Sequence, residues 1–378
     1  MDTTPAPALT LRPFEIAVPT AALEDLRARL AATRFAATLP SDDWGVGTPD
    51  AYLRDMVRRW LTFDWRVEEA RMNSRPNFLT HVDGQVIHFQ HVRSHHPKAV
   101  PLLLAHTYPG SFHEFADLID HLVNPTAHGG RAEDAFHLVI PSMPGFAFST
   151  PLSDGKWTMA RIATAWDALM RGLGYESYGA HGSDIGAMVA RELAILNPPG
   201  FLGAHVLQLF SFPTGDPAEF ANLAPEEYAA LEFAQWFTTV NGYATMNASR
   251  PNTIAAALSD SPVGQLAYNE LFNSFGNGTS LVSPNQILAQ ASLYWLTNTS
   301  AGSVRYHHAE RNTPTVRNDG PIGITVFAHD FQSIRTFAQR DNTQIVSWTS
   351  RPRGGHFAAL EVPNDLAEEI RSFYVQPH

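Results

Sequence analysis

The chain contains no cysteine among its 378 residues. This absence excludes disulfide bonds, thiolate metal sites and a cysteine nucleophile. No apolar run approaches the roughly 20 residues that a membrane-spanning helix needs. The N-terminus also lacks a basic segment followed by an apolar stretch, the pattern of a secretion signal. We therefore expect a cytoplasmic protein without a membrane partner.

Basic residues are scarce as well. The 26 lysine and arginine residues face 37 acidic ones, which gives a formal net charge of −11. A nucleic-acid surface needs clustered positive charge, so this balance argues against a nucleic-acid partner. Apolar residues make up 44% of the chain, which is enough to build a large core.

Strand and helix patterns alternate through much of the chain. The sequence predicts strands at 85–92, 100–105, 136–141, 201–210 and 322–328, a turn region beginning at Gly179, and helices at 185–196 and 363–373. Several of these strands are short continuous apolar runs, which are typical of strands covered on both faces. The alternation predicts a mostly parallel sheet with helices on both sides, an α/β fold.

Two further regions flank or interrupt this pattern. Residues 1–80 look helical, with an apolar stripe at Leu23, Leu26 and Leu30, and we expect them to wrap the core. Between 213 and 319 the strand pattern disappears and aromatic residues are frequent. We therefore expect a core formed by 81–212 and 320–378, with 213–319 inserted as a helical cap.

The segment 180–187 (AHGSDIGA) is the most informative motif. A nucleophile held at a sharp strand-to-helix turn needs small residues two positions before and two after it, because larger side chains would collide with the backbone. Asp184 has Gly182 and Gly186 at those positions, whereas Ser183 would have a histidine and an isoleucine. Asp184 is therefore the candidate nucleophile; the alternative is an ordinary glycine-rich turn with an aspartate helix cap.

Two other segments support this interpretation. Residues 106–110 (HTYPG) follow the strand at 100–105, where backbone N–H groups, together with that of Ile185, can hold a carboxylate and later an oxyanion. Residues 353–357 (RGGHF) precede the C-terminal helix and place His356 last in chain order, as in the triads of α/β hydrolases. The alternatives are a plain Pro-Gly turn and a surface histidine.

With these segments identified, the chain resembles the microsomal-type epoxide hydrolases in their soluble bacterial form, from about residue 12 to the end. The resemblance rests on 12–14 (RPF), 25–30 (DLRARL), 63–66 (FDWR), 260–264 (DSPVG) and 354–361 (GGHFAALE). It implies an α/β-hydrolase fold with an inserted helical cap. It also implies an enzyme that opens an epoxide with water and needs neither a cofactor nor a metal.

The resemblance carries roles over by position. Asp184 matches the nucleophile and His356 the general base. The orienting acid is expected after a late strand, where 327–331 (FAHDF) places Asp330; Asp319 and Asp341 are rivals that do not directly follow a strand. Tyr243 matches a cap tyrosine that donates a hydrogen bond to the epoxide oxygen, with cap packing as the alternative role.

The chain departs from the family pattern at the second cap tyrosine. Strict register within 303–307 (SVRYH) puts His307 at that position, with Tyr306 one residue earlier. Either residue could donate the second hydrogen bond, or Tyr243 could act alone. The oxyanion loop carries Tyr108, and Ile185 follows the nucleophile, where tryptophan is common in the family. Both contribute mainly backbone N–H groups, so these changes affect pocket shape more than chemistry.

Asp184 is then expected to form a hydroxyalkyl ester that water, activated by His356, hydrolyses to a vicinal diol. The aromatic cap favours an apolar, aromatic-tolerant pocket. One alternative is a haloalkane dehalogenase, against which Ile185 and Tyr243 both argue. Another is a catalytically weak hydrolase repurposed for binding or biosynthesis. The choice between detoxification and secondary metabolism stays open, as does the oligomeric state, for which a homodimer is one arrangement.

A metal enzyme is a further alternative, because the chain has 17 histidines. His88, His91, His95 and His96 cluster in sequence. However, His88 and His91 lie on opposite faces of a predicted strand, and no carboxylate joins them at ligand spacing. We therefore interpret this cluster as a solvated histidine-rich edge and expect no metal.

Overall fold

The structure is a computed structural model, and it describes residues 9–375 except 38, 40–42, 222 and 276–278. A nine-stranded sheet runs through it in the order β1-β2-β3-β5-β4-β6-β7-β8-β9. The strands are β1 (Arg12–Phe14), β2 (Asn77–Val82), β3 (Gln85–Val92), β4 (Val100–Ala105), β5 (Phe136–Pro141), β6 (Tyr178–Gly182), β7 (Phe201–Val206), β8 (Ile322–His329) and β9 (Ile345–Gly355). The pairs from β5 to β9 are parallel, and β1, β2, β3 and β5 pair antiparallel.

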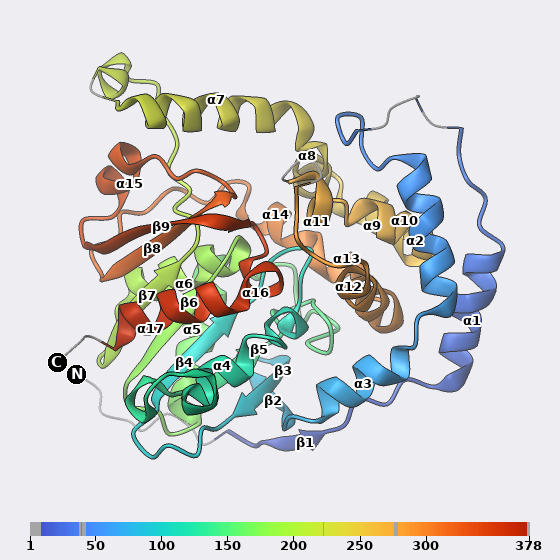
Figure 1. The fold of residues 1–378 in the computed structure, drawn as a ribbon, viewed down its shortest axis with the longest axis horizontal. Coiled ribbons are helices and arrows are strands. Elements are labelled where there is room, and N and C mark those ends of the chain that lie inside the picture. Colours follow the sequence, from blue (N-terminus) through green and yellow to red (C-terminus); the bar gives the residue numbers. More distant parts are fainter. Residues whose placement is uncertain (1–8, 38, 40–42, 222, 276–278, 376–378) are drawn as a thin grey trace.

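Helices cover both faces of this sheet (Figure 1). Those associated with it are α4 (Ile119–Val123), α5 (Met159–Gly172), α6 (Ile185–Leu196), α15 (Arg335–Asp341), α16 (Ala358–Glu361) and α17 (Pro363–Tyr374), with the short helices η1 (Phe112–Phe115), η2 (Pro125–His128) and η3 (Ala132–Asp134). Helices α5 and α6 pack on one face, and α4 and α17 pack on the other. This arrangement confirms the predicted α/β architecture.

The core lies on both sides of the central strands. Along β4, Leu103 belongs to the cluster beneath α5 and α6, whereas Leu102 and Leu104 belong to the cluster on the opposite face. All three side chains are fully buried. Because side chains alternate across a strand, a continuous apolar run is what a strand covered on both faces requires.

The segment between β7 and β8 consists of helices. They are η4 (Pro217–Phe220), α7 (Pro225–Val240), α8 (Gly242–Ser249), α9 (Pro251–Asp260), α10 (Pro262–Tyr268), α11 (Leu271–Ser274), α12 (Pro284–Thr297), α13 (Ser300–Ser303) and α14 (Arg305–Glu310). None of the described residues in 213–319 lies in a sheet strand, as the sequence predicts. Figure 1 shows α7 crossing above the sheet and the other helices beside it.

The N-terminal region is only partly helical. It forms α1 (Thr20–Ala31), α2 (Asp50–Thr62) and α3 (Trp65–Asn73), and the stripe Leu23, Leu26 and Leu30 is buried as predicted. The expectation of helix throughout 1–80 is wrong at β1 and β2, which add two strands to the antiparallel edge of the sheet. Helix α2 reaches the α7–α14 segment, because the indole N–H of Trp60 donates to Ser292 on α12 over 2.8 Å.

Three other predictions need correction. Gly179 does not begin a turn; it lies in β6, all five residues of which are buried. The strand predicted at 201–210 ends at Val206. Strand β9 has no sequence signal, because polar residues interrupt its apolar ones and most of its residues are half-exposed or exposed, so it lacks the apolar run of a central strand. It matters for the site because it ends one residue before His356.

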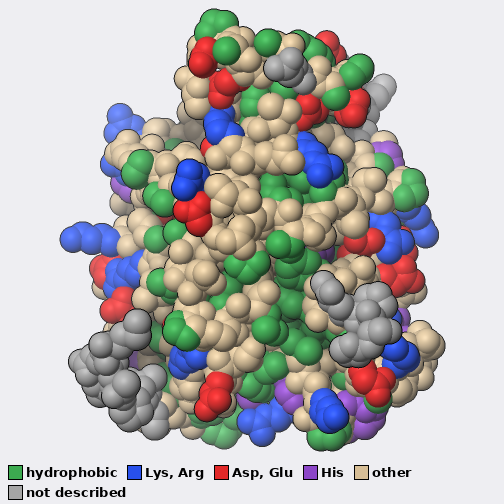
Figure 2. All heavy atoms as spheres, turned by 90° about the vertical axis from the view of Figure 1, so that its left-hand side faces the viewer, with side chains coloured by type: hydrophobic (Ala, Val, Ile, Leu, Met, Phe, Trp, Pro, Cys, Tyr) green, Lys and Arg blue, Asp and Glu red, His purple; other side chains and the backbone are tan. Residues whose placement is uncertain are grey.

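The surface carries charges of both signs. On the face shown in Figure 2, acidic and basic side chains are interspersed around apolar and neutral surface rather than gathered by sign. Among the described residues, no helix combines the length and apolar character that crossing a bilayer requires.

Candidate active site

Asp184 lies at the turn between β6 and α6, with a backbone φ of 53° and ψ of −121°. Positive φ is costly for a residue other than glycine and persists only where the surroundings enforce it. The two flanking glycines allow the turn. A Cβ on Gly182 would lie 2.1 Å from the carbonyl oxygen of Gly186, and one on Gly186 would lie 2.0 Å from that of Ala105. The spacing that identified Asp184 therefore has a steric cause in the structure.

Two backbone N–H groups hold the Asp184 carboxylate. The N–H of Tyr108, in the loop after β4, donates to Oδ2 of Asp184 over 2.9 Å. The N–H of Ile185 also donates to this carboxylate and lowers its pKa. Both residues named from the sequence as backbone donors thus lie at Asp184. Donors placed in this way can support negative charge on an oxygen attached to the carboxyl carbon.

His356 and Asp330 form a buried pair beside Asp184. Nδ1 of His356 lies 2.7 Å from Oδ1 of Asp330, and both side chains are almost fully buried. Asp330 follows β8 directly, and His356 follows β9, the neighbouring parallel strand. The rivals lie elsewhere: Asp319 is exposed and accepts from Thr343, and Asp341 pairs with Arg340.

The pKa values of Asp184 and His356 are shifted by burial and by neighbouring charges. Burial raises the pKa of Asp184, against the charge of His356 and the two N–H donors, which lower it. Burial lowers the pKa of His356, but the charges of Asp330 and Asp184 outweigh this effect, so its pKa is raised. Each group therefore favours the charged form of the other, and an imidazolium formed between two carboxylates is stabilised.

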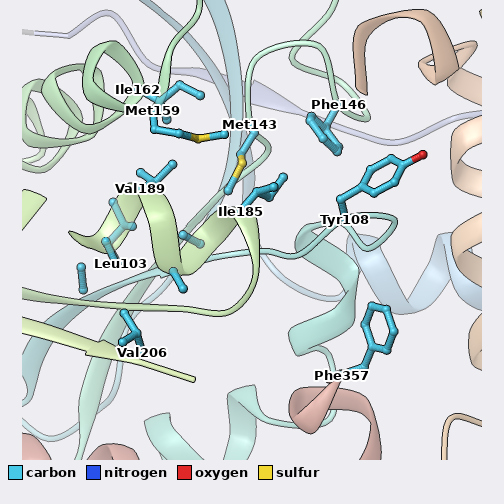
Figure 3. Packing of buried hydrophobic residues seen from close by; sticks show 14 of the residues in the cluster. Leu103, Tyr108, Met143, Phe146, Met159, Ile162, Ile185, Val189, Val206 and Phe357 are labelled. Carbon is cyan, nitrogen blue, oxygen red and sulfur yellow. The ribbon is translucent and has the colours of Figure 1, made fainter. Parts of the chain in front are cut away.

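Tyr243, Tyr306 and His307 lie together around the ring of Tyr108, which belongs to the loop after β4. The Tyr108 ring is 6.1 Å from the Tyr243 ring, 5.7 Å from the Tyr306 ring and 6.0 Å from the His307 ring. Figure 3 shows the Tyr108 hydroxyl pointing out of the core cluster toward the helical segment, with Phe146 close by. Helix α8 carries Tyr243, and α14 carries Tyr306 and His307.

These three residues differ in their electrostatic surroundings. Burial raises the pKa of Tyr243 and of Tyr306 well above the usual value, and the Asp184 charge is the second cause in both cases. Burial alone lowers the pKa of His307, to about 3. Burial and the negative charge of Asp184 therefore keep both phenols protonated, and His307 is neutral.

Asp184 and the two tyrosines near it keep part of their surface accessible. Asp184, Tyr243 and Tyr306 are half-buried rather than sealed among protein atoms. Tyr243 also borders a cavity of about 310 Å³ whose lining includes Trp44, Trp236, Phe237 and Glu270. The tyrosine thus contacts both Tyr108 and a partly aromatic cavity.

Helix α13 touches the core through a contact between two glycines. A Cβ on Gly302 would lie 2.2 Å from the carbonyl oxygen of Gly145, and one on Gly145 would lie 3.0 Å from the backbone of Gly302. Phe146 follows Gly145, and its ring lies 6.5 Å from that of Tyr306. Helix α13, which leads directly into the helix α14 that carries Tyr306, therefore packs on the core through backbone atoms.

Three further polar residues lie at the site without any sequence signal that marks them. Gln208, two residues beyond β7, contacts both Asp184 and Asp330. Glu114 on η1 accepts hydrogen bonds from the N–H and hydroxyl of Thr107, and burial raises its pKa to about 8. Asn247 on α8 is fully buried between Tyr268 and His307. The partners of Gln208 and Asn247 are distant in sequence, and Glu114 itself lies outside the 106–110 motif that contains its partner Thr107, so no local pattern marks these three residues.

The interpretation of the histidine cluster as a solvated edge is wrong for His88 and His91, although His95 is exposed and His96 is half-exposed. His88 is fully buried and bonds to Ser142 and Asn77, while His91 is buried against the Tyr175 hydroxyl. Strand β3 is flanked by β2 and β5 rather than lying at the edge, which explains the burial. Within the described ranges, no group of three or more His, Asp or Glu side chains is arranged to hold a metal ion.

The chain is similar to known proteins along most of its length. The family model described as "Epoxide hydrolase N terminus" matches residues 11–115, and the model of the "alpha/beta hydrolase fold" matches residues 100–224. The solved structure of the Aspergillus niger epoxide hydrolase aligns with a TM-score of 0.84 at 30% identity, covering 97% of each chain.

Two relatives match along almost the whole chain. A protein of Stigmatella aurantiaca named "Putative epoxide hydrolase" is 44% identical over 376 residues, which are 97% of this chain and 85% of the relative. Epoxide hydrolase 1 of Sus scrofa is 29% identical and covers 96% of this chain and 88% of its own. The chain therefore belongs to the epoxide hydrolase family, enzymes of the α/β-hydrolase fold that hydrolyse the ether bond of epoxides.

Proposed function

We propose that the chain opens apolar epoxides to vicinal diols through a covalent ester on Asp184. The observation that carries the proposal is the position of the Asp184 carboxylate, which accepts from Tyr108, lies beside the His356–Asp330 pair and faces two tyrosines. In this proposal residues 213–319 form a cap over the core of 81–212 and 320–378, and residues 1–80 support both.

In the first step a carboxylate oxygen of Asp184 attacks an epoxide carbon. The C–O bond of the ring breaks, and the ring oxygen takes a proton from a tyrosine hydroxyl, either Tyr243 or Tyr306. Proton donation matters because an unassisted alkoxide is a poor leaving group, and the covalent step divides one difficult reaction into two easier ones. The product is a hydroxyalkyl ester on Asp184 and a tyrosinate.

In the second step Nε2 of His356 removes a proton from water, whose oxygen attacks the carboxyl carbon of Asp184. The N–H groups of Tyr108 and Ile185 stabilise the oxyanion. Asp330 holds the Nδ1 side of the ring and supports the imidazolium. Collapse releases the diol, which takes the proton from His356, and the new carboxylic acid returns its proton to the tyrosinate through solvent. One carboxylate oxygen now derives from water.

The chemistry of the cavity supports the substrate class. Of its lining residues, Trp44, Trp236 and Phe237 are aromatic, and Tyr243 joins them to the site. Apolar walls with a few placed polar groups favour an apolar ligand that is oriented by hydrogen bonds. We therefore propose aryl or alkyl epoxides as substrates.

The test is to follow one turnover of styrene oxide by intact-protein mass. In oxygen-18 water the wild-type enzyme should gain one labelled oxygen in the peptide that contains Asp184. His356→Gln should accumulate the ester, and Asp184→Ala should form neither ester nor diol. Robust diol formation by Asp184→Ala, or label appearing only in the diol of the first turnover, refutes the proposal.

A further inference from the structure

Tyr306 and His307 contact each other directly. The Tyr306 hydroxyl oxygen lies 3.0 Å from Nε2 of His307, and the other ring nitrogen of His307, Nδ1, lies 3.4 Å from the side-chain nitrogen of Asn247. A neutral imidazole donates from one nitrogen and accepts at the other. Which of the two faces Tyr306 decides how that tyrosine can act.

The orientation of Asn247 answers this question. Its side chain is fully buried, and its oxygen accepts from the Tyr268 hydroxyl over 2.6 Å, a length suited to O–H···O. With the oxygen used in this way, the NH₂ group faces Nδ1 of His307. The same amide also bonds the Tyr108 hydroxyl and lowers its pKa, as a donor does. Because an NH₂ group can only donate, Nδ1 of His307 is an acceptor.

The proton of His307 is then on Nε2, the nitrogen that faces Tyr306. Burial lowers the pKa of His307 to about 3, so the ring stays neutral in the working range and keeps this tautomer. Nε2–H therefore donates to the Tyr306 oxygen. A phenol oxygen that already accepts this bond is free to direct its own proton elsewhere.

We infer that His307 is a positioning residue: it does not touch the epoxide, but it aims the Tyr306 hydroxyl at the epoxide oxygen and supports the phenolate that remains. This inference rests on the proposed ester formation at Asp184. In that step the Tyr306 proton moves to the ring oxygen as the C–O bond breaks. The resulting charge on the Tyr306 oxygen meets the Nε2–H of His307, whose proton stays in place.

The alternative is that His307 itself donates to the epoxide, as strict sequence register suggests. Its one N–H is already directed at Tyr306, and a neutral imidazole has no second proton to give. The Asp184 charge contributes to the raised pKa of Tyr306, whereas burial alone accounts for that of His307. The Tyr306 hydroxyl oxygen accepts the hydrogen bond from His307 and keeps its own proton for the epoxide, so His307 acts through Tyr306.

The test measures ester formation alone, with styrene oxide and the His356→Gln protein as parent. Tyr306→Phe should slow ester formation by about tenfold or more, because Tyr243 then donates alone. His307→Phe should slow it to a similar extent. His307→Gln, which can still present an N–H toward Tyr306, should recover most of the rate. His308→Gln is the matched control, because His308 lies on the same helix and bonds the Ala248 carbonyl instead.

A double-mutant cycle separates positioning from direct donation. If His307 acts through Tyr306, His307→Phe should have almost no effect in the Tyr306→Phe protein. Ester hydrolysis in proteins that retain His356 should stay unchanged, which a general loss of structure would not allow. Multiplying effects, or an unchanged rate in His307→Phe, would overturn the inference. If the His356→Gln parent itself forms no ester, the proposed function fails first and this inference fails with it.

Discussion

The side-chain oxygen of Gln208 accepts a hydrogen bond from the backbone N–H of Asp184 over 2.6 Å. The side-chain nitrogen of the same residue donates to Oδ2 of Asp330 and to the Ser183 hydroxyl. Oδ1 of Asp330 remains available to His356 and to the N–H of Phe331. A single buried amide therefore joins the strained turn at Asp184 to Asp330, the hydrogen-bond partner of His356.

Replacing Gln208 by methionine should lower kcat for styrene oxide by about tenfold to a hundredfold with little change in KM. The substitution keeps the size of the side chain but leaves the Asp184 N–H and an Asp330 oxygen unpaired, at about 1–3 kcal/mol each. Steady-state kinetics and thermal unfolding measure the two effects. Gln85→Met is the matched control, because Gln85 is equally buried and bonds only the backbone of 86 and 149–153. Equal kcat values in the two variants would contradict the role given to Gln208.

Asp330→Asn should slow ester hydrolysis by about a thousandfold or more and let the ester accumulate. An amide at this position presents an N–H to Nδ1 of His356 or loses the charge that supports the imidazolium, and either change impairs the base. Rapid-quench mass analysis of the enzyme measures the ester. Asp319→Asn, a change at an exposed carboxylate paired with Arg317, should leave the hydrolysis rate unaltered. A strong effect of the second variant would reassign the acid.

Gly186→Ala should reduce both stability and activity. The added methyl group would lie 2.0 Å from the Ala105 carbonyl oxygen, so either α6 or β4 must shift, and overpacking of this kind costs about 1–3 kcal/mol. The shift would also move Asp184 away from the N–H of Tyr108. Urea unfolding and single-turnover ester formation measure the two losses. Gly155→Ala is the control, because nothing lies within 4 Å of the Cβ it would add.

Acid should destabilise the fold through its buried histidines. Burial lowers the pKa of His88 to about 3, while an unfolded histidine titrates near 6.5. Between these values the unfolded chain binds a proton that the folded chain does not, so the free energy of unfolding falls as pH drops below about 6.5. Each such histidine contributes about 1.4 kcal/mol per pH unit in that window.

Between about pH 7 and pH 5 the free energy of unfolding should therefore fall less in His88→Gln than in the wild type. The difference should be at most the contribution of one proton, about 1.4 kcal/mol per pH unit. Urea unfolding at several pH values within this range measures the slope. His81→Gln is the matched control, since His81 is exposed on the neighbouring strand β2. If both variants change the slope equally, burial of His88 is not the source of the effect. Buried His205, whose pKa is also lowered to about 3, contributes in the same direction and stays unchanged in both variants.

The features that were predictable from sequence are those with a local cause. Strands β4 and β5 are short, largely apolar runs, and the helix expected at 185–196 coincides with α6. In each case the spacing of apolar residues within the segment itself predicts which side chains are buried. The Asp184 turn is likewise set by two glycines within five residues. Strand β9 could not be predicted, because a half-exposed strand of mixed apolar and polar residues has no such pattern.

The rest of the site depends on contacts between distant segments. Gln208 lies 24 residues from Asp184 and 122 from Asp330, so no spacing rule connects them. Sequence spacing also could not decide which of Tyr306 and His307 takes the position of the second cap tyrosine. Which of two adjacent side chains faces a site depends on the rotation of the short helix α14 and on partners such as Asn247, and these appear only in three dimensions.

The backbone contact between Gly145 and Gly302 fixes how closely α13 approaches the loop that carries Phe146. A methyl group at either position would act as a spacer, lifting the helix that leads to Tyr306 away from the loop that carries Phe146. In the proposed mechanism Tyr306 is a proton donor four residues beyond Gly302, so even a small shift would increase its distance from the epoxide oxygen. We therefore expect a larger residue at either glycine to widen the space between α13 and this loop and to slow the proposed reaction, without altering any residue that is proposed to touch the epoxide.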